Sequence, residues 1–286
     1  MGKSSTRNSR SKTPLPATEQ ILPLVAADGA RASLHLHGGH LLSWVPAGER
    51  EDRLYLSPIS KPAPGVAIRG GVPVIFPQFA GEGRLPKHGF ARTARWSLIG
   101  SDRGSALLRL SDTPETRAIW PQAFQADLRI EVAGRRLAMR FSVTNTGEQP
   151  CQFTAALHSY LRVHDIAQVE LLGLQGVRYR DSAAGGVARQ EQAASIRIAG
   201  EVDRIYLQAP PELQLREPGR RLRIAQTGFS DTVVWNPGPA KAAALADLEQ
   251  PDGYRRMLCV EAAVIGEPVR LAPGASWSGI QTLHAD

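Results

Sequence analysis

The chain has few cysteines, few aromatic residues and no long apolar run. Its 286 residues include only Cys151 and Cys259, too few for a disulfide framework and too sparse for a cysteine-rich zinc site. No stretch approaches the roughly 18 uninterrupted apolar residues that a membrane-spanning helix needs. The N-terminus is polar and basic, with no apolar signal-peptide core after it. We therefore expect a cytoplasmic protein with no membrane partner, in which both cysteines are small core residues.

Positive charge exceeds negative charge, but it is not gathered into a nucleic-acid-binding surface. The formal net charge is +7, and four basic side chains within residues 1–12 supply +4 of it before the first acidic residue, Glu19. Apart from this tail and residues 220–223, no cluster of basic residues with stacking aromatic residues occurs. The hydrophobic share of 42% and the charged share of 21% are typical of soluble globular proteins. We expect no nucleic-acid partner.

The first sixteen residues differ in character from the rest. Residues 1–16 are rich in serine, arginine and lysine, contain two prolines and lack periodic apolar positions. Such a segment cannot bury enough apolar surface to offset the entropy that is lost on ordering. We expect a disordered basic tail at residues 1–16 and a single β-sandwich domain at residues 17–286.

Beyond the tail, apolar and polar residues alternate with a period of two, which is typical of half-buried strands. Residues 32–36 and 125–132 show this alternation. Further strands are expected over residues 105–110, 136–145, 151–163, 168–174, 221–226, 257–262 and 277–283. Because strands do not alternate with helices, the pattern favours an all-β fold of two large antiparallel sheets packed face to face.

Two short helices are expected to interrupt the strands. Thr113, Pro114 and Glu115 form a helix start, with an N-cap, a proline at the first helical position and an acid in the first turn. This helix should lead to Trp120. A second helix is predicted over residues 240–246, because alanine has the highest helix propensity and Pro-Gly-Pro precedes the segment.

Two loops carry side chains that suit an oxygen-rich ligand. Residues 67–79 (AIRGGVPVIFPQF) and 86–92 (PKHGFAR) are dense in glycine and proline, which is typical of structured loops. Arginine forks match phosphate oxygens, and glutamine and histidine match hydroxyl groups. The side chains in question are those of Arg69, Gln78, His88 and Arg92. Their composition indicates a surface that recognises a polyol or a phosphate.

Two more polar residues stand within apolar strands. His158 alternates with apolar neighbours, and taken alone it is more typical of a satisfied, half-buried histidine than of a functional one. Glu261 lies in the apolar segment 258–263 (LCVEAA), where burying a lone carboxylate is costly. Either Glu261 pairs with a structural arginine, or it lines a cleft as a base with a shifted pKa.

Three histidines lie within six residues, which raises the question of a metal site. His35 and His37 would share one face of a strand, with His40 shortly after them. However, glycines 38 and 39 intervene, and no nearby cysteine or acid completes a set of ligands. We expect no metal there.

Six motifs follow one another along the chain: residues 67–79, 87–92 (KHGFAR), 156–163 (ALHSYLRV), 201–206 (EVDRIY), 231–237 (DTVVWNP) and 259–261 (CVE), the last followed by 267–269 (EPV). Together they resemble the hexose-6-phosphate mutarotases, also called glucose-6-phosphate 1-epimerases, of the aldose 1-epimerase superfamily. The resemblance covers roughly residues 20 to 283. Alanines 262 and 263 depart from the residues that some members carry after the CVE motif.

The resemblance implies a β-supersandwich of the galactose-mutarotase type that needs no metal and no organic cofactor. Residues 17–286 would then be the catalytic domain, acting on a small-molecule sugar phosphate such as glucose 6-phosphate, and we expect a monomer. His158 would be the general acid at the ring oxygen, and Glu261 the general base at the anomeric hydroxyl. The implied phosphate ligands are Arg69 and Arg92, and the residues implied to line the sugar site are Gln78, His88 and Asp203.

One acid and one base are chemically sufficient for mutarotation. The C1 hydroxyl loses a proton while the ring oxygen gains one, the ring opens, and it recloses on the other face. This requires an ionised Glu261 and a protonated His158. Two alternatives stay open: an aldose 1-epimerase for free sugars, which the two arginines disfavour, and a non-catalytic sugar-binding sandwich, which has no need of the pair. Lys87 is expected to be an exposed lysine beside the loop.

Overall fold

The computed structural model describes residues 21–286, so the tail predicted over residues 1–16 lies outside the described residues. The strands are β1 (Ile21–Val25), β2 (Arg31–His35), β3 (His40–Val45), β4 (Val74–Ile75), β5 (Ser97–Asp102), β6 (Ser105–Ser111), β7 (Phe124–Ala133), β8 (Arg136–Asn145), β9 (Cys151–Leu157), β10 (Tyr160–Arg162), β11 (Glu170–Leu172), β12 (Arg178–Asp181), β13 (Val187–Gln190), β14 (Ser195–Ile196), β15 (Val202–Tyr206), β16 (Glu212–Glu217), β17 (Arg220–Thr227), β18 (Asp231–Asn236), β19 (Met257–Leu271) and β20 (Ser276–Ala285). The α-helices are α1 (Pro114–Ile119) and α2 (Gly238–Ala242). Within residues 21–286, no helix has both the length and the apolar character needed to cross a membrane.

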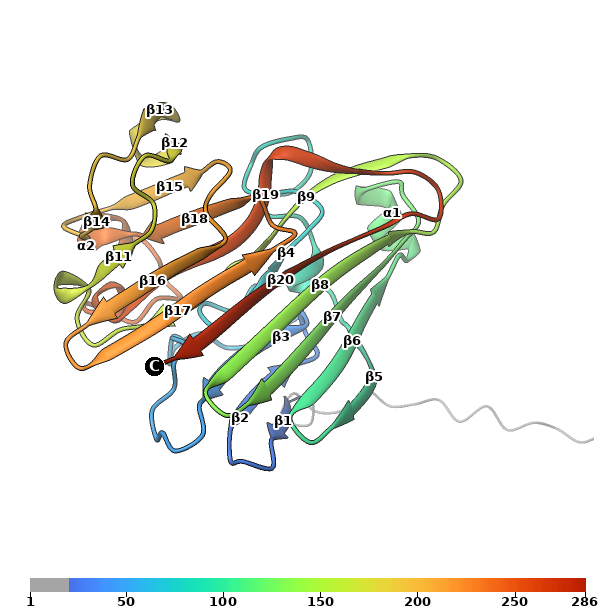
Figure 1. Cartoon of the computed structure of the whole chain (residues 1–286). Helices are drawn as coiled ribbons and strands as arrows, with labels where there is room; N and C mark the ends of the chain where they lie inside the picture. Colours follow the sequence, from blue (N-terminus) through green and yellow to red (C-terminus); the bar gives the residue numbers. More distant parts are fainter. Residues whose placement is uncertain (1–20) are drawn as a thin grey trace, which may run out of the picture.

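These strands form two large sheets and one small sheet, all antiparallel. The nine-stranded sheet has the order β14-β11-β16-β17-β20-β8-β7-β6-β5. The eight-stranded sheet has the order β13-β12-β15-β18-β19-β9-β4, with β10 also paired to β19, and β1-β2-β3 form the third sheet. Figure 1 shows the long strands of the nine-stranded sheet in front of β15, β18 and β19, with β1 to β3 below. The expected all-β fold with two large antiparallel sheets is confirmed, and the third sheet adds to it.

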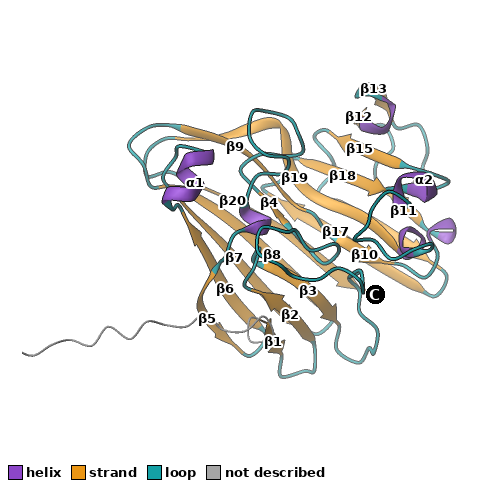
Figure 2. Ribbon diagram, turned by 180° about the vertical axis from the view of Figure 1, so that it is seen from behind, coloured by secondary structure: helices purple, strands orange, loops and turns teal. Residues whose placement is uncertain are grey.

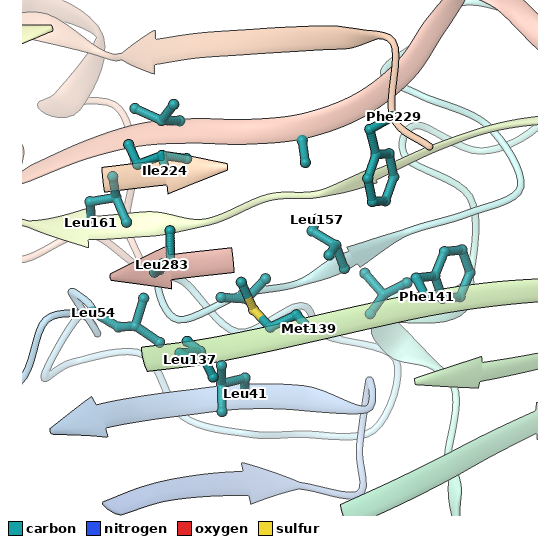
Figure 3. Packing of buried hydrophobic residues seen from close by; sticks show 14 of the residues in the cluster. Leu41, Leu54, Leu137, Met139, Phe141, Leu157, Leu161, Ile224, Phe229 and Leu283 are labelled. Atoms are coloured by element: carbon teal, nitrogen blue, oxygen red, sulfur yellow. The ribbon is translucent and has the colours of Figure 1, made fainter. Parts of the chain in front are cut away.

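Side chains between the two large sheets form the main core. On β8, Leu137, Met139 and Phe141 stand at alternate positions and are fully buried, as the period of two predicts. Leu157 and Leu161, near the ends of β9 and β10, belong to the same cluster (Figure 3). Because each large apolar side chain contributes roughly 1.5–3 kcal/mol when it is buried, this shared core holds the sheets together.

Strand β19 has two buried faces with different surroundings. Leu258, Val260 and Ala262 belong to the main core between the large sheets. Cys259 and Ala263 point to the opposite face and belong to two smaller clusters. Side chains alternate between the faces of a strand, so a residue at position 261 also points away from the main core. The face of β19 that carries Glu261 is therefore buried outside the main core, where it can form part of a functional site.

Most predicted elements occur close to their expected positions. Strand β8 has the predicted bounds, and α1 begins after Thr113, whose side chain accepts a hydrogen bond from the Thr116 backbone. Helix α2 starts earlier and is shorter than predicted, because the chain turns after it and lets Leu248 join Ala242 in one buried cluster. The strand expected over residues 151–163 is interrupted at residues 158 and 159.

Two histidines hold the loop that carries Arg69. His37 Nε2 donates to the Val66 carbonyl and His40 Nε2 donates to the Gly70 carbonyl, both at 2.7 Å. At Gly70, φ is +106°, and a Cβ atom would lie 2.4 Å from a backbone oxygen, so only glycine fits. Burial lowers the pKa of His40 to about 3, so its imidazole is neutral in the folded protein near neutral pH.

This burial predicts a pH-dependent stability. An unfolded histidine has a pKa near 6.5, so the unfolded state binds an extra proton between about pH 6.5 and pH 3, and stability falls as the pH falls through that window. From pH 7 to pH 5 the His40 contribution is about 2 kcal/mol of unfolding free energy. In urea titrations, His40→Gln should therefore lose less stability than wild type over this range. Equal losses would contradict the buried neutral state.

Candidate active site

A cavity of about 300 Å³ opens on the face of the eight-stranded sheet that points away from the main core. Figure 2 views the molecule from behind and shows that loops cross this side. Six of the seven residues proposed from the sequence line this cavity: Arg69, His88, Arg92, His158, Asp203 and Glu261. Residues separated by up to 192 positions thus share one hollow. Gln78, the seventh, is not among the lining residues that the structure describes.

Two rows of side chains from neighbouring strands form the floor. In one row Asp203 on β15 lies opposite Trp235 on β18, which in turn lies opposite Cys259 on β19. In the next row Val233 of β18 lies opposite Glu261 of β19. Since opposite residues of antiparallel strands point to the same face, the register alone brings an acid from β15 and an acid from β19 to one surface.

The interruption between β9 and β10 places His158 over this floor. The His158 amide donates to the Pro73 carbonyl, and the Ser159 carbonyl accepts from the Val260 amide, so backbone hydrogen bonds fix both residues of the break. His158 Nε2 then lies 3.3 Å from Glu261 Oε1. His158 is 9% exposed and Glu261 only 1%, so this imidazole and carboxylate meet almost without water.

Aromatic rings fix the orientation of the His158 imidazole. The Tyr160 ring stacks on it with 4.7 Å between centroids and 9° between planes. Trp235 meets it edge-on at 5.9 Å, and the His88 ring lies 6.0 Å away. A side chain held on several sides keeps one geometry relative to its partner, which proton transfer requires.

Burial opposes charge on both members of the pair. It lowers the pKa of His158, and the positive charges of Arg69 and Arg92 lower this pKa further. Burial also raises the pKa of Glu261, as does the charge of Asp203, while Arg92 acts in the opposite direction. With substrate absent, these shifts favour a neutral imidazole beside a protonated carboxyl group. The sequence-based expectation had the proton on His158.

Arg69 is anchored on two sides within the cavity. Its Nε donates to Asp247 Oδ1 at 3.1 Å, and its Nη1 donates to the Tyr160 hydroxyl at 2.9 Å. The guanidinium also lies 5.9 Å from the centre of the Trp235 ring. Because Tyr160 stacks on His158, Arg69 is linked to the imidazole through one intermediate ring.

Arg92 is bound more loosely. Its Nη2 donates to the Lys87 carbonyl at 3.1 Å, and among residues 21–286 it has no carboxylate partner within ion-pair distance. Burial and the nearby charge of Arg69 lower the pKa of Arg92. Lys87 itself lines the cavity as well, although it is exposed. A guanidinium with this surplus of positive charge favours an anion in the cavity.

His88 and Gln78 belong to one loop but have different surroundings. His88 has φ +66°, its Nδ1 accepts from the Ala80 amide at 3.3 Å, and burial lowers its pKa to about 3. The neutral ring then carries its proton on Nε2. The Gln78 amide donates to the Leu85 carbonyl and accepts from the Leu85 amide, so Gln78 ties this loop together from behind.

At the rim, Asp203 faces a lysine from α2. Lys241 Nζ lies 3.9 Å from Asp203 Oδ2 and 2.7 Å from Glu201 Oε1. Burial raises the pKa of Asp203, while the Lys241 charge counteracts this rise. Asp203 thus offers a hydrogen-bond acceptor to a hydroxyl group in the cavity.

A buried glutamine behind the site was missed in the sequence. Gln281 on β20 is fully buried; it accepts from Ser159 Oγ at 2.5 Å and donates to the Val260 carbonyl at 3.0 Å. These two partners directly follow His158 and precede Glu261, so an amide from the nine-stranded sheet fixes both. The sequence does contain a sign of this role. Gln281 stands at an alternate position with Trp277 and Leu283, on the strand face that points to the core, where an apolar residue is expected.

A larger surface hollow of about 700 Å³ lies along β16 and β17 and shares no lining residue with the cavity. Two of its arginines have acidic partners, in the ion pairs of Arg197 with Glu170 and of Arg220 with Glu217. Paired surface charges of this kind are ordinary solvated structure.

Residues 21–284 match the family model described as aldose 1-epimerase. The chain belongs to this family. Among the proteins it is similar to, one from Cenchrus ciliaris, provisionally named glucose-6-phosphate 1-epimerase, is 35% identical over 95% of this chain and 87% of its own length. An Escherichia coli K12 protein with the same provisional name is 34% identical over 88% of this chain and 90% of its own length.

The fold comparison agrees with the sequence comparison. The crystal structure of a provisionally named mutarotase from Salmonella typhimurium matches with a TM-score of 0.84 and 30% identity, covering 93% of this chain and 90% of that one. The galactose-mutarotase type of sandwich that the sequence predicts is therefore confirmed for this chain.

Gln281→Met should lower the epimerase activity, although Gln281 does not line the cavity. The change leaves a buried hydroxyl and a buried carbonyl without a partner, which costs about 1–3 kcal/mol of unfolding free energy. It also loosens both catalytic candidates, and misplacement of reacting groups costs about 10-fold or more in kcat with KM nearly unchanged.

The matched control is Gln226→Met, because Gln226 lies opposite Gln281 on β17 and its amide is bound to the Phe229 and Asp231 carbonyls instead. Gln226→Met should lose stability at unchanged kcat. If Gln281→Met also keeps the wild-type kcat, Gln281 serves the fold alone.

Proposed function

We propose that this protein interconverts the α and β anomers of a hexose 6-phosphate, with glucose 6-phosphate as the first candidate. The observation that carries the proposal is the buried His158–Glu261 contact, which opens onto a cavity that also holds two guanidinium groups. Family membership and the names of the relatives support the same activity. The cavity volume of about 300 Å³ suits a single sugar ring with its phosphate.

The proposed reaction needs one proton to move through the pair. Glu261 takes the proton of the C1 hydroxyl while His158 gives a proton to the ring oxygen, which opens the hemiacetal. After rotation about the C1–C2 bond, the same two groups act in reverse and close the ring. The 3.3 Å contact lets the proton return between them within the site.

The substrate phosphate is proposed to set the starting position of that proton. Arg69 and Arg92 both lower the pKa of His158. A phosphate dianion beside them cancels this positive field. Cancelling the Arg92 charge raises the pKa of both groups, but the Arg69 charge acts on His158 and not on Glu261, so the balance moves the proton from Glu261 to His158. Binding of the correct substrate would then convert a resting neutral pair into the acid and base that the reaction needs.

Two other functions make different demands on these residues. An epimerase for free sugars would use the pair but would gain nothing from Arg92, which has no carboxylate partner among the described residues. A sugar-binding sandwich would have no use for a buried histidine and glutamate in contact. The roles of His88 and Asp203 in this proposal are hydrogen bonds to sugar hydroxyls, and Gln78 positions the loop that carries His88.

Removing either member of the pair should abolish most of the catalysis. Glu261→Gln and His158→Ala are each expected to lower anomer exchange of glucose 6-phosphate by at least about 10², since general acid–base catalysis contributes about 10² to 10⁴ per group. Magnetisation-transfer NMR gives the exchange rate after the uncatalysed rate is subtracted. Near-wild-type exchange in a folded variant would refute the role of that residue.

Arg92→Ala should separate phosphorylated from free sugars. Loss of a charge-assisted hydrogen bond to phosphate is expected to raise KM for glucose 6-phosphate about 30- to 1000-fold, with little change for glucose. Arg69→Ala should impair both substrates, because Arg69 also holds Tyr160 against His158.

Arg129→Ala on the outer surface of β7 is the matched control for the loss of one positive charge. It should leave KM unchanged for both glucose 6-phosphate and glucose. Equal effects of Arg92→Ala on both sugars would remove the phosphate from this proposal and favour the free-sugar epimerase.

A further inference from the structure

A third potential ligand stands beside the proposed acid–base pair. Cys259 was expected to be a core residue, and it is fully buried, but it points to the site face of β19 two residues before Glu261. A ring nitrogen of His158, the sulfur of Cys259 and a carboxylate oxygen of Glu261 all lie within 4.8 Å of one another. Within residues 21–286 this is the one group of three such side chains.

One pair within this trio already has the spacing of two ligands on a zinc ion. With bonds of about 2.0–2.3 Å, ligand atoms on a tetrahedral zinc lie about 3.3–3.6 Å apart. His158 Nε2 and Glu261 Oε1 are already 3.3 Å apart. Glu261 Oε2 and His158 Nδ1 are buried with no hydrogen-bond partner in the described residues, so each of these atoms can still bind a ligand. His158 and Glu261 also line the cavity, so a metal held by them could take a fourth ligand from that side.

We propose that His158, Cys259 and Glu261 form an inhibitory site for a thiophilic divalent cation such as Zn²⁺ or Cd²⁺. A thiolate and a carboxylate together balance the charge of the dication, and a neutral imidazole completes the set. The thiol gives up its proton to solvent, and so does the carboxyl group if it holds one. Affinity should therefore rise with pH, because protons and the metal compete for the same atoms.

Occupation of this site would stop the reaction directly. The metal takes the lone pairs of both groups that are proposed to move protons, and it stands on the floor of the sugar cavity. Inhibition should be competitive with glucose 6-phosphate and reversed by a chelator. Binding itself depends only on the three side chains and can be measured whichever sugar the protein accepts.

The test uses Cd²⁺ as the probe, because a thiolate bound to it gives an ultraviolet charge-transfer band. Wild type and Cys151→Ala should show one equivalent of this band, since Cys151 lies opposite Leu271 at the far end of β9. Cys259→Ala should lack it and should weaken Zn²⁺ inhibition at least about 100-fold, because even outer-shell changes at zinc sites cost 10–100-fold. Melting curves confirm that each variant is folded, and Cys259→Ser replaces Cys259→Ala if the latter is not.

Three results would overturn the proposal: a band that persists without Cys259, a band that is lost with Cys151, or one equivalent of bound Cd²⁺ that leaves anomer exchange unaffected. If wild type shows the band but exchanges no hexose phosphate, the proposed function fails while the metal site stands.

Discussion

The contact between the buried imidazole of His158 and the buried carboxyl group of Glu261 is the constraint on which the site depends. Neither group can carry a charge cheaply where it lies, since burial alone moves both pKa values toward the neutral forms. Two groups in contact under these conditions share a single proton. The surrounding charges then decide which of them holds it.

The fold meets this constraint by giving one strand two functions. Leu258, Val260 and Ala262 of β19 pack between the large sheets, and Glu261 between them lines the cavity on the other face, so the site rests directly on the core. Gln281 extends this support from the opposite sheet to the neighbours of both His158 and Glu261. A rigid floor of this kind suits proton transfer, which tolerates little misplacement.

Much of the fold was predictable because it follows from local pattern. Period-two alternation located β7, β8 and β20, and the N-cap at Thr113 located α1. The edge strands and short strands were harder: β5 is exposed at all six positions, and β4 has only two residues, so neither shows alternation. In α2, packing of Leu248 overrode the high helix propensity of alanine.

Part of the site was predictable, from the resemblance to a known family and from polar residues at positions where apolar ones are expected. Glu261 drew attention as a lone acid in an apolar strand, but its contact with His158 joins residues 103 positions apart and depends on strand register, which the sequence does not display. The placement of Gln78 behind its loop and of Cys259 beside the pair likewise follows from register and loop closure. The resting protonation state differs from the expectation because it depends on the depth of burial.

The central claim is that a bound phosphate moves the shared proton onto His158 by cancelling the field of Arg69 and Arg92. The ¹⁵N chemical shifts of the His158 imidazole near pH 7 test it directly, in the free protein and at saturation with glucose or with glucose 6-phosphate. The account predicts a neutral ring in the free protein and with glucose, and an imidazolium with glucose 6-phosphate. A ring that is cationic in the free protein, or that stays neutral with the phosphorylated sugar, would contradict it.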